Sequence, residues 1–380
     1  MTREDRYANR RARVAERLEA AGPKGEPVGS LLVTDLRNIS YLTGFRGSAG
    51  VLLLDAGGRG VLSTDSRYDV QVREQAPGVD HVITRDYFAG ALGAAESSGT
   101  GAALADQSAS VGVEAHDVTL ARATALHKAL EEAGRTGGVV ETTSLVEEVR
   151  RVKDDVELAA IARACDVVDI AWEAALAGGW IRAGRTERAI AADLEHAMRV
   201  AGSDGTSFDT IVASGPNGAL PHHRTSDRML AQGDLVVIDF GALVDGYASD
   251  CTRTVAIGSL PDELRKIYDI VLAAQREAVD AVAPGVGCAA LDSIAREHIT
   301  RAGYGENFGH SLGHGVGLDV HEGPAVSARS DSTLVVGDVV TVEPGIYLPG
   351  LGGVRIEDTV AVTGSGHQVL TTTSKDLVEL

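Results

Sequence analysis

Two acids flank a short turn signal with the spacing that a divalent-cation site requires. Asp239 ends an apolar run, and Asp250 lies in the next run, after the dipeptide Asp245-Gly246. This dipeptide is the strongest short-range sign of a tight hairpin, and it sets Asp239 opposite Thr252. Asp239 and Asp250 then project from one face as diagonal neighbours. Because two such carboxylates repel each other, a bound cation would keep both ionised.

A second acidic pair has a similar arrangement near the C-terminus. Glu343 and Glu357 flank the turn-rich stretch 348–353. The longer loop leaves the strand register open, and a pairing centred on Gly350 would place the two glutamates opposite each other.

Histidines complete the candidate site. His310 and His314 lie in the glycine-rich segment 309–322, where a helix is disfavoured, so we expect them to share a face of an extended strand. Four carboxylates and one imidazole suit two oxygen-preferring divalent cations. Manganese is the first prediction, with cobalt or zinc as alternatives.

These residues need a scaffold of strands and helices, and the length of 380 residues favours two domains. We predict an α/β (α+β) chain divided into residues 1–147 and 148–380. The first domain is expected to contain strands at 30–34, 49–54, 60–64 and 79–84, helices at 68–75 and 120–133, and a Gly/Ala/Ser-rich loop at 89–103. Helices at 156–177 and 186–201 are expected to open the second domain.

A weak internal repeat supports the assignment of the acidic strands. Residues 233–239 (GDLVVID) resemble residues 337–343 (GDVVTVE), and each run ends in a carboxylate. Duplication is one explanation, and the frequency of a turn, strand and acid in sequence is another.

Composition excludes several classes of function. The formal net charge of −19 opposes binding to nucleic acid, and no apolar stretch is long enough to predict a membrane span. The Arg-rich N-terminus lacks the apolar run of a signal peptide, and the three cysteines show no Cys-x-x-Cys spacing. A cytoplasmic location is therefore expected.

Several motifs together resemble the aminopeptidase P and prolidase branch of the pita-bread metallopeptidases. They are 220–223 (LPHH), 237–241 (VIDFG), 249–253 (SDCTR), 310–322 (HSLGHGVGLDVHE), 343–347 (EPGIY) and 353–358 (GVRIED). Upstream, 41–50 (YLTGFRGSAG) and 63–68 (STDSRY) resemble the creatinase-type N-terminal domain. The resemblance implies a small α/β domain, a pita-bread domain with a curved antiparallel sheet, and a homodimer or higher oligomer.

The resemblance also implies roles for individual residues. The metal ligands would be Asp239, Asp250, His314, Glu343 and Glu357. Glu343 would also accept a proton from the attacking water. The groups around the substrate and transition state would be His222, His310, His321 and Arg355, with Tyr347 as a further substrate contact. His223 has no assigned role.

The predicted activity is that of an Xaa-Pro aminopeptidase, in which a metal-bridging hydroxide cleaves the N-terminal bond of peptides with proline in the second position. The short connection within 345–355 favours this reading, and an Xaa-Pro dipeptidase, or prolidase, is the alternative. Two other classes remain. The GHSLG run at 309–313 fits a nucleophile elbow with Ser311 as a serine hydrolase nucleophile, and some pita-bread proteins bind peptides without catalysis.

Overall fold

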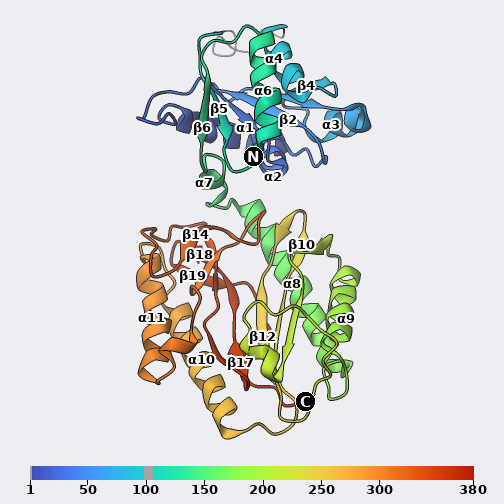
Figure 1. The fold of residues 1–380 in the computed structure, drawn as a ribbon, viewed down its shortest axis with the longest axis vertical. Coiled ribbons are helices and arrows are strands. Elements are labelled where there is room, and N and C mark those ends of the chain that lie inside the picture. Colours follow the sequence, from blue (N-terminus) through green and yellow to red (C-terminus); the bar gives the residue numbers. More distant parts are fainter. Residues whose placement is uncertain (1, 98–105) are drawn as a thin grey trace. The chain divides into compact units, whose positions relative to one another are not determined.

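The computed structural model describes residues 2–97 and 106–380 and divides into two compact units, Met1–Arg150 and Arg151–Leu380 (Figure 1). We call the second one the catalytic unit, because it contains the predicted metal ligands and the motifs that resemble a metallopeptidase. Among the helices in these described ranges, none combines the length and apolar character that a membrane span needs.

The first unit is built on a six-stranded sheet in the order β4-β3-β2-β1-β5-β6. Its strands are β1 (Ser30–Val33), β2 (Val51–Asp55), β3 (Gly60–Thr64), β4 (Asp80–Ile83), β5 (Val111–Glu114) and β6 (Val139–Thr142). Its helices are α1 (Arg3–Leu18), α2 (Leu36–Thr43), α3 (Asp69–Gln75), α4 (Tyr87–Ser97), α6 (Leu120–Glu132) and α7 (Glu147–Arg150), with the 3₁₀ turn η1 (Ser66–Tyr68). Strand β2 is antiparallel to its neighbours, and the other pairs are parallel.

The loop predicted at 89–103 is wrong for its first part, because α4 runs through residue 97. Alanine is the strongest helix former, and Ala91 and Leu92 pack in the buried core beside the sheet. Tertiary packing therefore decides a segment whose glycine content suggested a loop. Residues 98–103 of the predicted loop lie outside the described residues.

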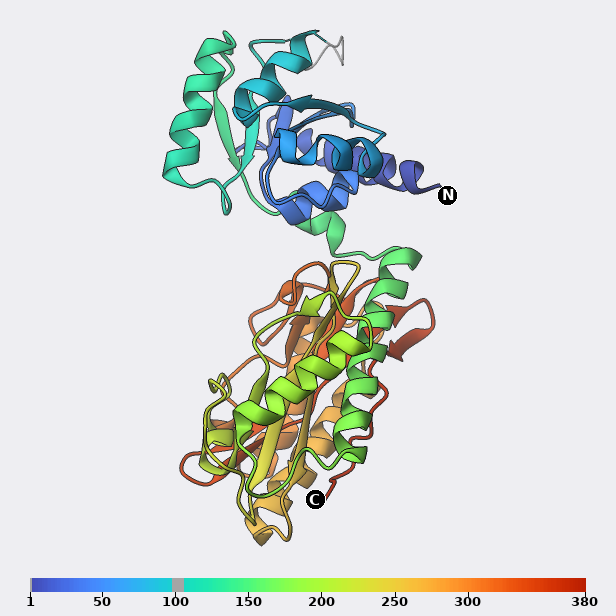
Figure 2. The same cartoon turned by 90° about the vertical axis from the view of Figure 1, so that its right-hand side faces the viewer.

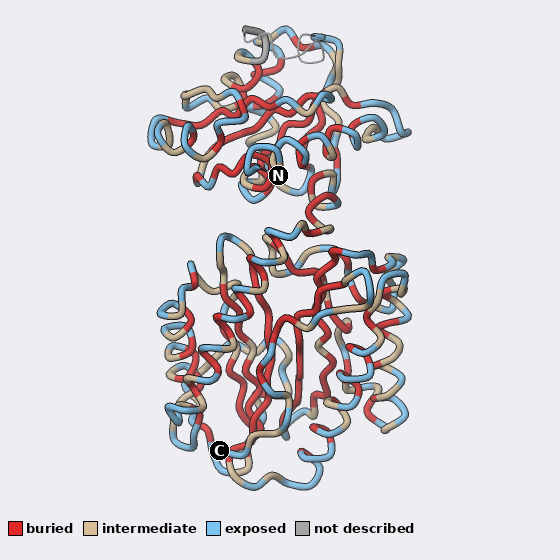
Figure 3. The backbone as a smooth tube through the Cα atoms, turned by 180° about the vertical axis from the view of Figure 1, so that it is seen from behind, coloured by how far each residue is buried: buried red, intermediate tan, exposed pale blue. Residues whose placement is uncertain are grey.

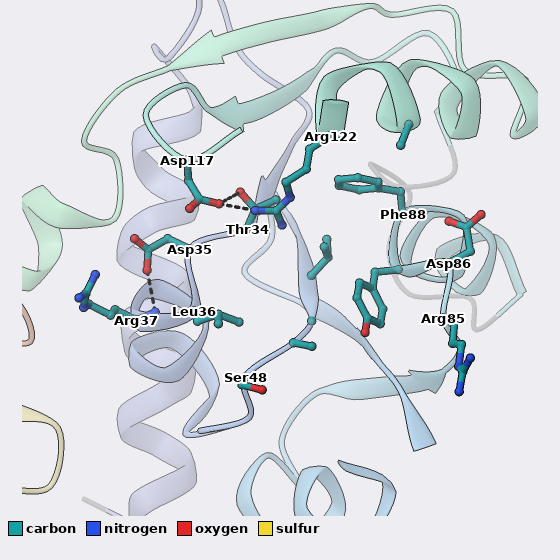
Figure 4. Close-up of a pocket in the computed structure, with 15 residues that line it drawn as sticks. Thr34, Asp35, Leu36, Arg37, Ser48, Arg85, Asp86, Phe88, Asp117 and Arg122 are labelled. Atoms are coloured by element: carbon teal, nitrogen blue, oxygen red, sulfur yellow. Dashed lines mark hydrogen bonds and ion pairs between the residues drawn. The ribbon is translucent and has the colours of Figure 1, made fainter. Parts of the chain in front are cut away.

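A cavity of about 1030 Å³ with a mixed polar and apolar lining opens in the first unit where β1 and β5 end (Figure 4). Asp117 accepts hydrogen bonds there from the Thr34 hydroxyl at 2.6 Å and from Arg122 at 2.7 Å. These contacts tie the end of β1 to the start of α6.

The catalytic unit carries its strands in several small antiparallel sheets. They are β7 (Gly205–Thr206), β8 (Ile211–Ser214), β9 (Leu235–Phe240), β10 (Ala242–Val244), β11 (Tyr247–Ala248), β12 (Cys251–Ala256), β13 (Gly313–Gly315), β14 (Glu322–Val326), β15 (Val339–Val342), β16 (Gly345–Leu348), β17 (Gly352–Arg355), β18 (Asp358–Thr363) and β19 (Gly366–Val369). The sheet orders are β11-β10-β7, β12-β9-β8, β14-β13-β15-β18-β19 and β16-β17.

Four long helices cover these strands. They are α8 (Asp155–Ala177), α9 (Glu187–Val200), α10 (Asp262–Asp280) and α11 (Cys288–Arg301), with the 3₁₀ turns η2 (Gly215–Ala219) and η3 (Gly305–Asn307). Helices α8 and α9 lie on one side of the strands, and α10 and α11 lie on the other (Figure 2). The strands are buried while the outer helix faces are exposed (Figure 3). The acidic strands thus lie in the buried interior of the unit.

The two GD repeats fold in the same way. Gly233 and Gly337 both have positive φ, at 86° and 93°. The aspartate after each accepts an N–H from three residues earlier and pairs with an arginine: Asp234 with Arg228 at 2.6 Å, and Asp338 with Arg151 at 2.8 Å. The repeat predicted from sequence is therefore also a repeat of structure.

Candidate metal centre

Five side chains that lie in strands or beside strand ends meet in one cavity of about 450 Å³ in the catalytic unit. Asp239 lies in β9, Asp250 precedes β12, His314 lies in β13, and Glu343 and Glu357 follow β15 and β17. All five line this cavity.

The first hairpin has the predicted register. Val244 pairs with Tyr247, and Asp239 pairs with Thr252. Positive φ values at Asp245 and Gly246, 56° and 83°, match a two-residue turn that both residue types tolerate. The prediction that Asp239 and Asp250 are diagonal neighbours is therefore confirmed.

The second hairpin adopts one of the registers that the sequence left open, the pairing centred on Gly350. Val342 pairs with Asp358, and Gly345 pairs with Arg355. Both pairs are centred on Gly350, so Glu343 and Glu357 lie opposite each other between β15–β18 and β16–β17. This break in the hairpin is where the two carboxylates enter the cavity.

Distances within the cluster are those of a coordination site. Ligand atoms of Asp250, His314 and Glu357 all lie within 4.8 Å of one another. The His314 Nε2 atom lies 3.6 Å from Asp250 Oδ2 and 3.3 Å from Glu343 Oε1. His314 Nδ1 lies 3.1 Å from the Gly315 carbonyl, which only accepts, so this nitrogen carries a proton and Nε2 is the ring nitrogen that faces the carboxylates.

Without a cation between them, the close carboxylates in this cavity repel one another. Burial, and after it the charge of Glu357, raises the pKa of Asp250 well above its ordinary value. Burial and the charge of Glu343 raise the pKa of Glu357 in the same way. Burial also raises the pKa of Asp239. Burial opposes ionisation of Glu343 as well, but the hydrogen bond from His314 and the charges of His314, His310 and Arg355 together outweigh it and lower the pKa of Glu343.

The donor set fits divalent cations. Within the described residues, Asp239 Oδ1 and Glu357 Oε1 are buried without a hydrogen-bond donor, although acceptors in such positions are normally satisfied. Their other oxygens are held in place, since Arg355 donates to Asp239 Oδ2 at 2.7 Å and Thr252 donates to Glu357 Oε2 at 2.7 Å. One oxygen of each carboxylate is fixed and the other is available to a cation that prefers oxygen ligands.

The predicted substrate-shell residues gather around the same cavity. His222, His310, His321 and Arg355 line it. The His321 ring lies 4.3 Å from the His314 ring, between centroids. Tyr347 is buried behind the wall and joins a chain of hydrogen bonds: Arg355 donates to its hydroxyl at 3.0 Å, and the hydroxyl lies 2.8 Å from His310 Nε2.

This chain fixes the tautomer of His310. Its Nδ1 atom lies 2.8 Å from the Ser311 carbonyl, which only accepts, so Nδ1 carries the proton. Nε2 then accepts from the hydroxyl of Tyr347. Burial lowers the pKa of His310, in agreement with a neutral ring.

One expectation for the glycine-rich segment is wrong, and one alternative lacks the element that it requires. His310 does not share a strand with His314, because β13 begins at Gly313 and His310 lies in the loop after η3. The nucleophile elbow at Ser311 also lacks the helix that it needs, since β13 follows instead.

Sequence reasoning missed the groups that hold the ligands. Thr252 and Thr341 donate to Glu357 and Glu343, and their residue types carry no distinguishing signal. The apolar wall residues Phe208, Ile211 and Ala325 were missed as well. Only the strand register next to Asp239 could have pointed to Thr252.

The comparisons with known proteins agree with this geometry. Metallopeptidase family M24 matches residues 159–364, and the Creatinase/Prolidase N-terminal domain matches residues 10–152. An Xaa-Pro dipeptidase of Pyrococcus horikoshii is 38% identical over 92% of this chain and 95% of its own length.

Solved structures give the same result. An Xaa-Pro dipeptidase from Bacillus anthracis has a TM-score of 0.91 and 38% identity, covering 98% of this chain and 100% of its own. An X-Pro aminopeptidase from Thermotoga maritima has a TM-score of 0.82 and 38% identity, covering 93% of this chain and 98% of its own. These matches confirm the predicted α/β fold class, with a creatinase-like N-terminal domain and a pita-bread domain. The chain belongs to metallopeptidase family M24 and is a hydrolase of that family.

Proposed function

We propose that the protein is an Xaa-Pro dipeptidase that uses two divalent cations, with manganese as the first candidate. The observation that carries the proposal is the cluster of four carboxylates and His314, in which two buried oxygens are free for a cation. Relatives named as Xaa-Pro dipeptidases match nearly the whole chain. These relatives favour the dipeptidase, whereas the sequence alone favoured the aminopeptidase.

Several residues of the cavity have roles in the proposed hydrolysis of the peptide bond. Cations held by the five ligands would polarise the scissile carbonyl and make a water nucleophilic at neutral pH. Glu343 accepts the proton of the attacking water. The proline nitrogen must gain a proton as it leaves, and the exposed imidazole of His321, beside His314, is placed to deliver it.

The cavity wall also supplies donors for the carboxylate that ends a dipeptide. In an Xaa-Pro dipeptide this carboxylate lies only a few bonds from the scissile nitrogen. Arg355 is occupied, because it donates to Asp239, Pro221, Tyr347 and Thr252. The exposed His222 imidazole is therefore our candidate for contacting the carboxylate.

An Xaa-Pro aminopeptidase is the second candidate, favoured by the Thermotoga maritima relative. The two activities differ in whether the group after proline is a free carboxylate or a further residue. Either would act on peptides with proline in the second position.

The test compares Ala-Pro, Ala-Pro amide and Ala-Pro-Ala after the protein has been stripped with chelator and reloaded with manganese. A dipeptidase should cleave Ala-Pro with a kcat/KM about tenfold or more above the other two, a difference of about 1.4 kcal/mol. His222→Gln should reduce this preference. A preference for Ala-Pro-Ala would favour the aminopeptidase, and absence of metal-restored cleavage of all three would overturn both.

A further inference from the structure

A buried glutamate outside the cavity organises the loop that carries His222. Glu187 is the first residue of α9 and is fully buried. It does not line the cavity, and no role in the proposed reaction uses it. Its carboxylate nevertheless accepts six hydrogen bonds from four residues.

The two oxygens of Glu187 hold opposite ends of one segment. Oε1 accepts from the Ser214 backbone and hydroxyl at 2.8 and 2.7 Å, and from the Asn217 amide at 2.9 Å. Oε2 accepts from the Ser226 backbone and hydroxyl at 3.0 and 2.6 Å, and lies 2.9 Å from His223 Nε2. One carboxylate thus closes the loop between residues 214 and 226.

The loop presents two groups to the cavity. Its Pro221 carbonyl accepts from Arg355 at 3.2 Å, and His222 lines the cavity wall. His223, the next residue, has a mostly buried ring that faces Glu187. Because the carboxylate can only accept, Nε2 of His223 donates to it. Of these two adjacent side chains, His222 thus faces the cavity and His223 faces the carboxylate of Glu187.

The network requires a carboxylate at this position. Burial alone would raise the pKa of Glu187, but the hydrogen bonds outweigh burial and lower the pKa to about 2. An amide in its place would turn an NH₂ group toward donors on one side and would leave buried donors unsatisfied. Behind the network, Arg228 donates to the Ser214 hydroxyl at 2.6 Å and pairs with Asp234.

We propose that Glu187 and His223 are positioning residues, which fix the loop so that His222 points into the cavity and Pro221 meets Arg355. The proposal rests on the proposed peptidase function for its catalytic consequence. It also assigns a role to His223, which the motif leaves without one.

The catalytic arm is a double-mutant cycle on the manganese-loaded full chain. His223→Leu removes the donor, and we expect kcat/KM for Ala-Pro to fall about tenfold, or about 1.4 kcal/mol, whereas His223→Gln keeps an N–H donor and should restore most of the loss. In a His222→Ala background, His223→Leu should have less than about a twofold further effect, since coupled residues are not additive. Equal losses in both backgrounds, or no loss at all, would overturn the proposal.

The second arm needs no activity. Hydrogen exchange of the 215–226 segment should become faster in Glu187→Gln than in the parent, with the exchange of β9 and β12 unchanged. Asp193→Asn is the matched control, because Asp193 lies on the same helix and pairs with Arg185 away from the loop. Unchanged exchange in Glu187→Gln would overturn the proposal. An inactive parent with faster exchange in the variant would instead count only against the peptidase function.

Discussion

Manganese should stabilise the catalytic unit of the parent protein and fail to stabilise the Asp250→Asn variant. Asp250 is the residue to change because its carboxylate lies within coordination distance of both His314 and Glu357. Asparagine keeps the size of the side chain but removes its charge and one carboxylate oxygen. The substitution therefore tests the cation site without leaving a cavity.

The size of the effect follows from mass action. A cation at 100 times its Kd adds about 2.7 kcal/mol to the free energy of unfolding. For a unit of this size, each kcal/mol raises the Tm by about 2–4 °C, so manganese should raise the parent Tm by about 5–11 °C. In chelator the parent loses this advantage in Tm. Asp250→Asn should melt at the same temperature as the parent or higher, because it relieves the repulsion between Asp250 and Glu357.

Tryptophan fluorescence gives a selective assay. The chain has two tryptophans, Trp172 and Trp180, and both lie in the catalytic unit. Trp172 stacks on Phe240 of β9 with ring centroids 6.0 Å apart, so its emission reports the strand that carries Asp239. Melting is followed in chelator and in manganese for the parent, for Asp250→Asn, and for the surface control Asp193→Asn. If manganese did not change the Tm of the parent, or if it raised the Tm of Asp250→Asn as much as that of the parent, the assignment of Asp250 as a metal ligand would be refuted.

Three further changes test the scaffold of the site. Arg253→Met should lower the free energy of unfolding by about 1.5–3 kcal/mol in urea titrations, because the buried Asp358 carboxylate loses its 2.9 Å partner but keeps Lys375. The stabilisation that the ionised Glu187 carboxylate provides should be complete above pH 4.5 and should be lost as the pH falls toward 2. Between these pH values, the free energy of unfolding of Glu187→Gln should therefore fall by roughly 3 kcal/mol less than that of the parent in pH-dependent unfolding. Gly353→Ala should cut kcat/KM for Ala-Pro by more than about tenfold, because the new Cβ would lie 2.0 Å from the Gly218 carbonyl oxygen and displace η2.

Matched controls separate these effects from general damage. Arg265→Met breaks an exposed pair with Glu379 and should cost less than about 1 kcal/mol. Gly364→Ala adds a Cβ into open space and should leave kcat/KM unchanged. If Arg265→Met destabilised the chain as much as Arg253→Met, or Gly364→Ala impaired activity as much as Gly353→Ala, the assigned causes would be wrong.

The part of the site that lies on tight hairpins could be predicted from the sequence. A two-residue turn at Asp245 and Gly246 leaves one register, and that register places Asp239 opposite Thr252. The second turn is longer, so several registers satisfied the sequence and the structure selected the one centred on Gly350. Local turn chemistry thus determines how far a register can be derived.

The rest could not be predicted, because it depends on contacts between distant segments. His310 enters the cavity from a loop, and the chain of Arg355 and Tyr347 fixes its tautomer. Glu187 reads as the first acid of an amphipathic helix, and such acids are usually solvated. Its six hydrogen bonds exist only when the segment around His223 folds back onto α9.

The position of Arg355 changes how its substitution should be interpreted. An arginine in a peptidase cavity suggests contact with the substrate carboxylate, yet this guanidinium is almost fully buried and donates to four protein groups. One of them is Asp239, whose free oxygen faces the cation site. A lysine at this position could not reproduce the fork of donors. Loss of activity on its substitution would therefore report the alignment of Asp239 and of the His222 loop, and a substrate contact could be inferred only if metal affinity stayed unchanged.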